Sequence, residues 1–144
     1  MTKLFTVAFF SLTLIACGQK TKSVDKDKQK LAQVCDTFMQ TFSKGQFKEA
    51  LTLFRENSVL GQEKIDTLIA TVTRQSEVVF PYYGKMISAE FIIERQIKDF
   101  IAKRFYILRF DKYYIRFDFT LYKTNIGWKI TSFSFDEEII ELLF

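Results

Sequence analysis

Hydrophobic residues recur at two different spacings along this chain, and the spacing changes near Gly84. Before that point they recur every three or four residues, which predicts three amphipathic helices. The first is expected over residues 31–45, because glycine commonly stops a helix, and the second lies in the stretch QFKEALTLF. The third is expected to end at Pro81, which lacks an amide donor. The apolar positions are Leu31, Val34, Cys35, Phe38, Phe42, Phe47, Ala50, Leu51, Phe54, Ile65, Leu68, Ile69, Val72 and Val79.

Beyond Gly84 apolar and polar residues alternate, which is typical of strands with one buried face. Four segments follow this pattern: MISAEFIIERQIKDF, KRFYILRF, YYIRFDFTLY and GWKITSFSF. The short connections at residues 111–112 and 124–127 suit hairpins, so we expect an antiparallel sheet. Helices first and strands afterwards, each with one apolar face, predict an α+β domain over residues 31–144. Its N-terminal amphipathic helices are expected to pack on a curved antiparallel sheet of about four strands.

This order of elements resembles the NTF2-like (cystatin-like cone) superfamily. The points of likeness are the amphipathic first helix, the KGQFKEAL turn into the second helix and the final strand GWKITSFSFD. The resemblance covers about residues 30–138. It implies a cone in which helices and sheet enclose a pocket. Some members are enzymes and many are binding or accessory modules, so the fold alone does not fix the function.

The start of the chain has a different character. Lys3 precedes an apolar run from Leu4 to Ala16, and the sequence turns polar directly after Cys17, which matches a secretion signal. The run is shorter than the roughly 20 residues of a membrane-spanning helix. The four residues LIAC at 14–17, that is Leu14, Ile15, Ala16 and Cys17, are similar to the lipobox of bacterial lipoproteins. That resemblance implies removal of residues 1–16 by cleavage between Ala16 and Cys17. It also implies attachment of diacylglycerol and palmitate-type acyl groups to Cys17, which becomes a membrane anchor.

Lysines are concentrated directly after this motif. The chain has a net charge of +4, most of which falls in the polar stretch GQKTKSVDKDKQK, while the remainder is balanced. We therefore expect residues 17–30 to form a basic flexible tether, and we do not expect nucleic acid as a partner. By resemblance to the lipoprotein sorting rule, Gly18 in place of Asp predicts the outer membrane, on its periplasmic side. In a host with one membrane the protein would lie on the outer face of the plasma membrane.

Candidate catalytic chemistry is sparse. The chain has no histidine and two cysteines, and Cys35 is expected to be a small buried hydrophobe. We find no metal-ligand cluster and no cofactor motif, so neither a metal nor a cofactor is expected. Arg116 and Asp118 share one face of a predicted strand, and with Asp99 or Arg109 nearby they are the candidates for a mechanism without histidine. The alternative is a purely structural role, in which these charges form a solvated face or a cross-strand ion pair.

Aromatic residues are unusually frequent, with 17 Phe, 6 Tyr and one Trp. Most lie on predicted core faces, and the others lie where the mouth of a cone would meet a ligand or partner. The candidate contact residues are Phe80, Tyr82, Tyr83, Tyr106, Tyr114, Arg116, Asp118 and Tyr122.

Two functional hypotheses follow. The first is a lipid-anchored, non-enzymatic binding or interaction module for a small apolar ligand or an envelope protein. The alternative is a small hydrolase or isomerase that uses Asp and Arg groups in the pocket. The two differ in whether Arg116, Asp118 or Asp99 points into a closed pocket or out to water.

Overall fold

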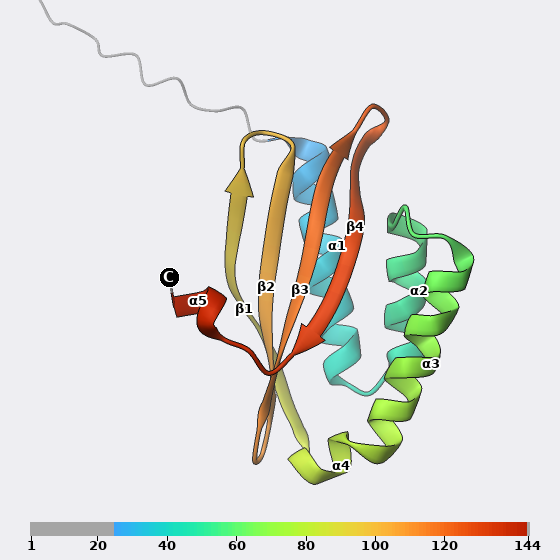
Figure 1. The fold of residues 1–144 in the computed structure, drawn as a ribbon, viewed down its shortest axis with the longest axis vertical. Coiled ribbons are helices and arrows are strands. Elements are labelled where there is room, and N and C mark those ends of the chain that lie inside the picture. The colour runs from blue at the N-terminus through green and yellow to red at the C-terminus, as the bar shows by residue number, and fades with distance from the viewer. Residues whose placement is uncertain (1–24, 144) are drawn as a thin grey trace, which may run out of the picture.

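Five helices and four strands make up the described part of the protein, residues 25–143 of a computed structural model (Figure 1). The elements are α1 (Lys26–Ser43), α2 (Phe47–Asn57), α3 (Gln62–Val78), α4 (Phe80–Tyr83), β1 (Met86–Ile97), β2 (Ile101–Phe110), β3 (Tyr114–Thr124), β4 (Gly127–Asp136) and α5 (Ile140–Leu143). The predicted signal peptide over 1–16, the predicted cleavage site and Cys17, the predicted lipidation site, lie outside the described residues. Within the described residues, no helix is long and apolar enough to cross a membrane.

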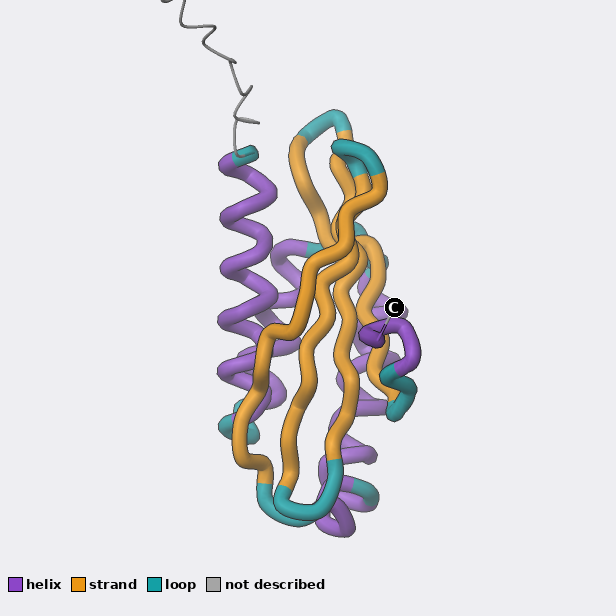
Figure 2. The backbone as a smooth tube through the Cα atoms, turned by 90° about the vertical axis from the view of Figure 1, so that its left-hand side faces the viewer, coloured by secondary structure: helices purple, strands orange, loops and turns teal. Residues whose placement is uncertain are grey.

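The strands form one antiparallel sheet in the order β1-β2-β3-β4, with α1 packed against one face (Figures 1 and 2). Register shifts in β1 and β4 pairing bend the sheet, since bulges increase local twist. The predicted α+β architecture, with N-terminal helices on a curved four-stranded antiparallel sheet, is therefore confirmed. The β1–β2 connection (98–100), the β3–β4 connection (125–126) and the first turn of α1 lie together. We call this the hairpin end; α4 lies at the opposite end (Figure 1).

Helix α1 begins earlier than the apolar pattern predicts. It starts at Lys26, and Asp25 caps it by accepting hydrogen bonds from the backbone amides of Asp27 (3.2 Å) and Lys28 (3.4 Å). An aspartate at this position stabilises the otherwise unpaired amides of the first turn. The expectation of a flexible tether through residue 30 is wrong for residues 25–30, which belong to the folded domain. Polar composition suggested a tether, but the cap and the ion pairs described below order this turn.

The space between α1 and the sheet is filled by aromatic rings. Phe38 of α1 lies at the centre, with ring centroids 5.2 Å from Phe119 and 5.3 Å from Phe133. One turn further along α1, Phe42 lies 5.1 Å from Phe117. Edge-to-face contacts of this kind stabilise a core beyond the area that they bury. Cys35 is also buried here, as the sequence predicts, and burial raises its pKa to about 12, so the thiol stays protonated.

Two local expectations are corrected by the structure. Helix α3 ends at Val78, and Pro81 lies in the first turn of the separate short helix α4, where its missing amide leaves no bond unmade. Strand β1 forms where the alternation predicts it, but its large apolar side chains are exposed rather than packed on the core. The register shifts fall at Ile87 and Ile92, and each one moves the following side chains relative to the simple alternation.

Candidate functional site

An open pocket of about 750 Å³ lies at the hairpin end, between α1 and the sheet. Its wall combines side chains from the start of α1, both hairpins and the middle of the sheet, which the fold brings together from distant parts of the sequence. Most of these side chains are charged or polar. The lining residues are Asp25, Lys28, Gln29, Ala32, Glu94, Gln96, Asp99, Arg104, Lys123 and Trp128.

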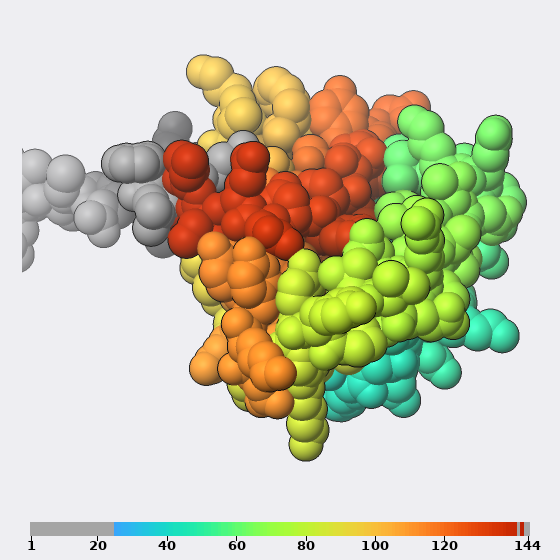
Figure 3. All heavy atoms as spheres, turned by 60° about the horizontal axis from the view of Figure 1, so that its bottom comes forward, coloured from blue at the N-terminus to red at the C-terminus, as the bar shows by residue number. Residues whose placement is uncertain are grey.

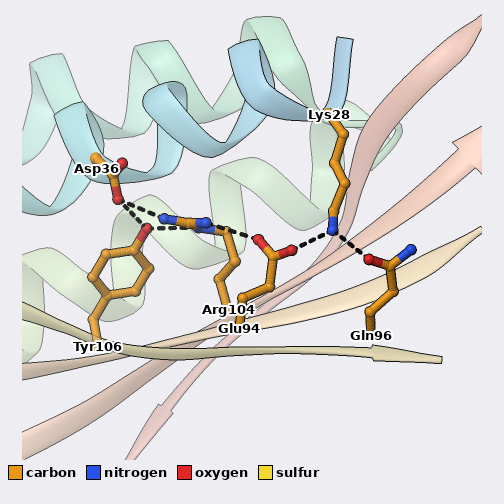
Figure 4. Close-up of polar contacts among 6 residues, drawn as sticks. All are labelled: Lys28, Asp36, Glu94, Gln96, Arg104 and Tyr106. Atoms are coloured by element: carbon orange, nitrogen blue, oxygen red, sulfur yellow. Dashed lines mark hydrogen bonds and ion pairs between the residues drawn. The ribbon is translucent and has the colours of Figure 1, made fainter. Parts of the chain in front are cut away.

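Arg104 of β2 is the centre of the polar network behind this pocket (Figure 4). Its guanidinium donates to Glu94 Oε2 on β1 (2.7 Å) and to Asp36 Oδ1 on α1 (2.8 Å), and its Nε donates to the Tyr106 hydroxyl (2.9 Å). The Tyr106 hydroxyl in turn donates to Asp36 at 2.6 Å. A guanidinium presents several donors in a rigid plane, so one buried arginine can join three elements. The network fastens α1 to β1 and β2.

Lys28 extends the network toward the pocket mouth. Its ammonium group pairs with Glu94 and donates to Gln96 Oε1 at 2.8 Å (Figure 4). Burial alone would raise the pKa of Glu94, but the hydrogen bonds from Lys28 and Arg104 outweigh it and lower that pKa. Burial and the hydrogen bond to Asp36 raise the pKa of Tyr106. Glu94 is therefore charged and Tyr106 neutral across the physiological pH range.

The other side of the pocket is held by Asp25, the residue that caps α1. Its Oδ2 accepts from Lys123 Nζ (2.8 Å) and from Trp128 Nε1 (2.9 Å). The hydrogen bond from Lys123, followed by that from Trp128, holds the pKa of Asp25 well below its usual range. One carboxylate thus joins the helix start to β3 and β4.

The chemistry of this pocket is that of a positioned ion network rather than of an acid-base pair. Lys28, Arg104 and Lys123 each contact a carboxylate within the network. Among the residues that the structure describes, no group of three His, Cys, Asp or Glu side chains could hold a metal ion. The arrangement fixes the shape and charge of the pocket and orders the start of α1.

Arg116 and Asp118, the candidates for a mechanism without histidine, lie on the other face of the sheet. Arg116 donates to Asp136 (2.7 Å) and lies 3.7 Å from Asp118, while Ser134 donates to Asp118 at 2.8 Å. Both residues are buried, and neither lines the pocket at the hairpin end, whereas Asp99 does. The structure therefore separates Asp99 from Arg116 and Asp118. Arg116 of β3 forms a cross-strand ion pair with Asp136 of β4, as expected for a structural role.

The aromatic candidates are dispersed rather than gathered at one mouth. Phe80 and Tyr106 are buried, Tyr82 is exposed on α4, and Tyr122 is exposed at the hairpin end. Tyr83 stacks on Tyr113 with centroids 4.7 Å apart, and Tyr113 stacks on Tyr114 at 5.4 Å. The hydroxyls of Tyr83 and Tyr113 both donate to Glu137, which raises the pKa of Tyr83 to about 12.

The C-terminal segment covers part of the sheet face away from α1. Ile139 and Leu142 line a shallow pocket of about 340 Å³ together with Ile107, Arg109 and Tyr114. Figure 3 shows the C-terminal segment lying across the surface beside the β-hairpin residues. Tyr114, a candidate contact residue, is therefore partly covered by the protein's own chain.

Sequence reasoning missed two features. The Arg104 network was not predicted, because its members, at positions 36, 94, 104 and 106, show no common motif. The exposed apolar side chains of β1 were assigned to the core, although the sequence held a signal. Phe91, Ile92 and Ile93 are three consecutive apolar residues, which breaks a period of two and is typical of a bulge.

Comparison of the chain with protein-family models, with curated proteins and with solved structures finds no match.

Proposed function

We propose that this protein is a lipid-anchored lipoprotein of the bacterial cell envelope, whose NTF2-like domain binds another envelope protein along strand β1. The domain acts as a non-enzymatic interaction module. The observation that carries the proposal is the set of large apolar side chains that the edge strand β1 exposes, with Phe91 on the α1 face of the sheet and Ile93 on the opposite face.

The anchoring half of the proposal rests on the lipobox at residues 14–17 and its preceding apolar run. It is supported by the position of the domain along the chain. The described part of the domain begins at Asp25, eight residue steps after Cys17, so a lipid on Cys17 would hold the domain close to a membrane. Gly18 in place of Asp favours the outer membrane.

The NTF2-like half is supported by the order of elements. The KGQFKEAL stretch forms the turn into α2, where Gly45 adopts a φ of 78° that favours glycine, and GWKITSFSFD forms the last strand β4. Helices α1 to α4 precede a curved antiparallel sheet, which is compatible with the resemblance. In this chain the middle of the space between α1 and the sheet is filled by Phe38, Phe119 and Phe133. The pocket that remains at the hairpin end is lined mostly by charged and polar side chains, which favours a protein partner over a small apolar ligand.

Strand β1 is suited to a protein partner for two reasons. It is an edge strand, and along it Ile87, Phe91, Ile92 and Ile93 are between 38% and 54% exposed. Apolar side chains gathered on one edge typically mark an interaction site. The bulges at Ile87 and Ile92 interrupt regular pairing, so we expect the partner to pack on side chains rather than to add a strand.

Intact mass spectrometry tests the anchor. The mature protein should have the mass of the chain from Cys17 plus diacylglycerol and acyl groups, and Cys17→Ala should prevent this modification. Gly18→Asp should move the protein to the inner membrane in a two-membrane host that uses the sorting rule. Recovery of the wild type as an unmodified chain would refute the anchor.

Photo-crosslinking in the native membrane tests the partner. A photoreactive phenylalanine analogue at Phe91 should capture one discrete envelope protein. The same analogue at Val78, which is exposed at the end of α3, should not capture it. Ile92→Asp, at the exposed residue next to Phe91, should weaken the capture from position 91. Equal capture from positions 78 and 91, or none from 91, would exclude β1 as the binding surface.

A further inference from the structure

The hairpin end carries its own group of exposed apolar side chains, separate from those in the middle of β1. Ile97 is 64% exposed and Phe100 is 42% exposed, both at the β1–β2 connection. At the β3–β4 connection, Tyr122 is 41% and Ile126 is 78% exposed. These four side chains are large, and a hairpin tip in water is normally built from polar residues. Exposed apolar side chains at one end of the molecule indicate that this end contacts another surface.

The two hairpins are joined into one tip. The backbone amide of Lys123 donates to the carbonyl of Phe100 at 2.9 Å, and the ring of Phe100 meets that of Tyr122 edge-on at 6.3 Å. The β3–β4 turn is closed by Thr124, whose hydroxyl donates to the carbonyl of Gly127 at 2.7 Å. The apolar tip is therefore an ordered feature of the fold.

This tip lies on the same side of the molecule as the start of α1 (Figures 1 and 2). Asp25 lies eight residue steps after Cys17, and this stretch spans at most about 29 Å when fully extended. A lipid on Cys17 thus keeps the hairpin end, rather than the α4 end, within reach of the membrane. The short stretch from Cys17 to Asp25 and its entry into the domain at the start of α1 both favour the hairpin end as the surface that faces the membrane.

Lysines outnumber carboxylates around the tip. Lys26, Lys30 and Lys98 are exposed at or near this end beside the exposed Asp27 and Asp99, and Lys20 and Lys22 follow Cys17 in the sequence. Lysines near a bilayer are attracted to anionic headgroups. Aromatic residues such as Tyr122 are favoured at the boundary between headgroups and acyl chains. Apolar tips bordered by lysines are what an interfacial contact requires.

We propose that the hairpin end docks into the headgroup region of the bilayer that holds the lipid anchor, with Phe100 and Ile126 entering the boundary with the acyl chains. This inference rests on the proposed anchoring at Cys17. Docking gives the domain one orientation: the sheet stands upright on the membrane, the α4 end points away, and the edge of β1 faces sideways toward other envelope proteins.

Spin labelling of the full-length, lipidated protein tests this docking. Nitroxide labels are placed at Ile126→Cys and Phe100→Cys, with Val78→Cys at the opposite end as the matched control. Cys17 is blocked by lipid and Cys35 is buried, so each label enters one position. The protein is reconstituted in vesicles of phosphatidylethanolamine and phosphatidylglycerol, and collision with oxygen and with a water-soluble nickel complex reports the depth of each label.

The labels at 126 and 100 should lie about 5–10 Å below the headgroup level, while the label at 78 stays in water. Labels at 126 and 100 that are as accessible to nickel as the label at 78 would overturn the docking while the anchor stands. Protection of 126 and 100 only when envelope proteins are added would also overturn it, and would assign the tip to a protein partner. If the chain carries no lipid by intact mass, the anchor fails and this inference fails with it.

Discussion

Strands β1 and β3 show the same alternation of apolar and polar residues in the sequence, yet the structure uses them in opposite ways. In β3, Phe117, Phe119 and Leu121 are fully buried beneath α1. In β1, Ile87, Phe91 and Ile97 are exposed. The difference lies in the neighbours: β3 is central, between β2 and β4, whereas β1 is an edge strand with two register shifts.

This contrast teaches that alternation predicts a strand but not which of its faces meets a core. A central strand has covered neighbours on both sides, so its apolar face is protected. Strand β1 lies at an edge, and its register shifts at Ile87 and Ile92 interrupt the alternation, so apolar residues become available to a partner. The other edge strand, β4, keeps Trp128, Ile130 and Phe133 buried. In this protein β3 contributes fully buried rings to the core, and β1 carries the partner contact that we propose. The predictions below test that division, from the largest expected effect to the smallest.

The largest effect is expected at the centre of the core. Phe119→Ala should lower the free energy of unfolding by about 3–5 kcal/mol, because it opens a cavity among the rings of Phe38, Tyr106 and Phe133. Urea unfolding of the purified domain measures the change.

The matched control is Phe91→Ala on β1. It should cost only about 1 kcal/mol, chiefly through its contacts with Tyr106 and with the guanidinium of Arg104, which lies 4.4 Å from the ring centroid. Equal losses for the two substitutions would break the contrast between β1 and β3.

The second effect concerns the connection between α1 and the β1 edge. Arg104→Met should cost about 2–3 kcal/mol, below the 3–5 kcal/mol of a fully buried pair, because Asp36 and Glu94 retain some solvent contact. Urea unfolding again provides the measurement. Arg109→Met, on an exposed residue of the same strand, should change stability by less than about 0.5 kcal/mol. A neutral result for Arg104→Met would show that the network does not stabilise the fold.

A smaller effect should appear in the dependence of stability on pH. Glu94 has a lowered pKa in the folded protein, so the unfolded chain takes up its proton more readily. Its contribution to stability is complete above its ordinary pKa of 4.5 and is lost as the pH falls below 4.5 through the lowered value. Glu94→Gln should therefore reduce the loss of stability in this acidic range. Unfolding curves recorded at several pH values measure the slope, and a variant profile parallel to the wild type would contradict the assignment.

The smallest effect on stability is expected on the exposed side of β1. Ile87→Ser should change the free energy of unfolding by less than about 0.5 kcal/mol, because the side chain lies in water. The same substitution should reduce crosslinking from position 91 to the envelope partner. A large loss of stability would mean that Ile87 serves the fold, and an unchanged crosslink would place the partner contact elsewhere on β1.

Several features were predictable from the sequence because they depend on local periodicity. The three long helices, the four strands and the two tight hairpins appear where the spacing of apolar residues predicts them. The burial of Cys35 and Phe38 followed from their place on one helical face. The start of α1 was not predicted, because the lysine-rich composition around residues 25–30 masked the cap supplied by Asp25.

The candidate site was predicted less well. Arg116 and Asp118 form the expected pair of charges on one strand face, but they lie on the side of the sheet opposite the pocket. Tyr106, expected at a mouth, is buried with its hydroxyl bonded to Asp36. Such outcomes depend on which element covers each strand, and a single strand sequence does not contain that information.

The sequence by itself therefore determined the order and type of the elements and the apolar faces of the helices, because both follow from the fixed geometry of a helix and a strand. Only the tertiary structure decided that β1 would expose its apolar residues and that Arg104 would join Asp36, Glu94 and Tyr106. It also decided that both hairpins would end on the same side of the molecule as the start of α1. The physical reason is that these features are contacts between residues far apart in the chain. Their partners are set by how the helices cover the sheet.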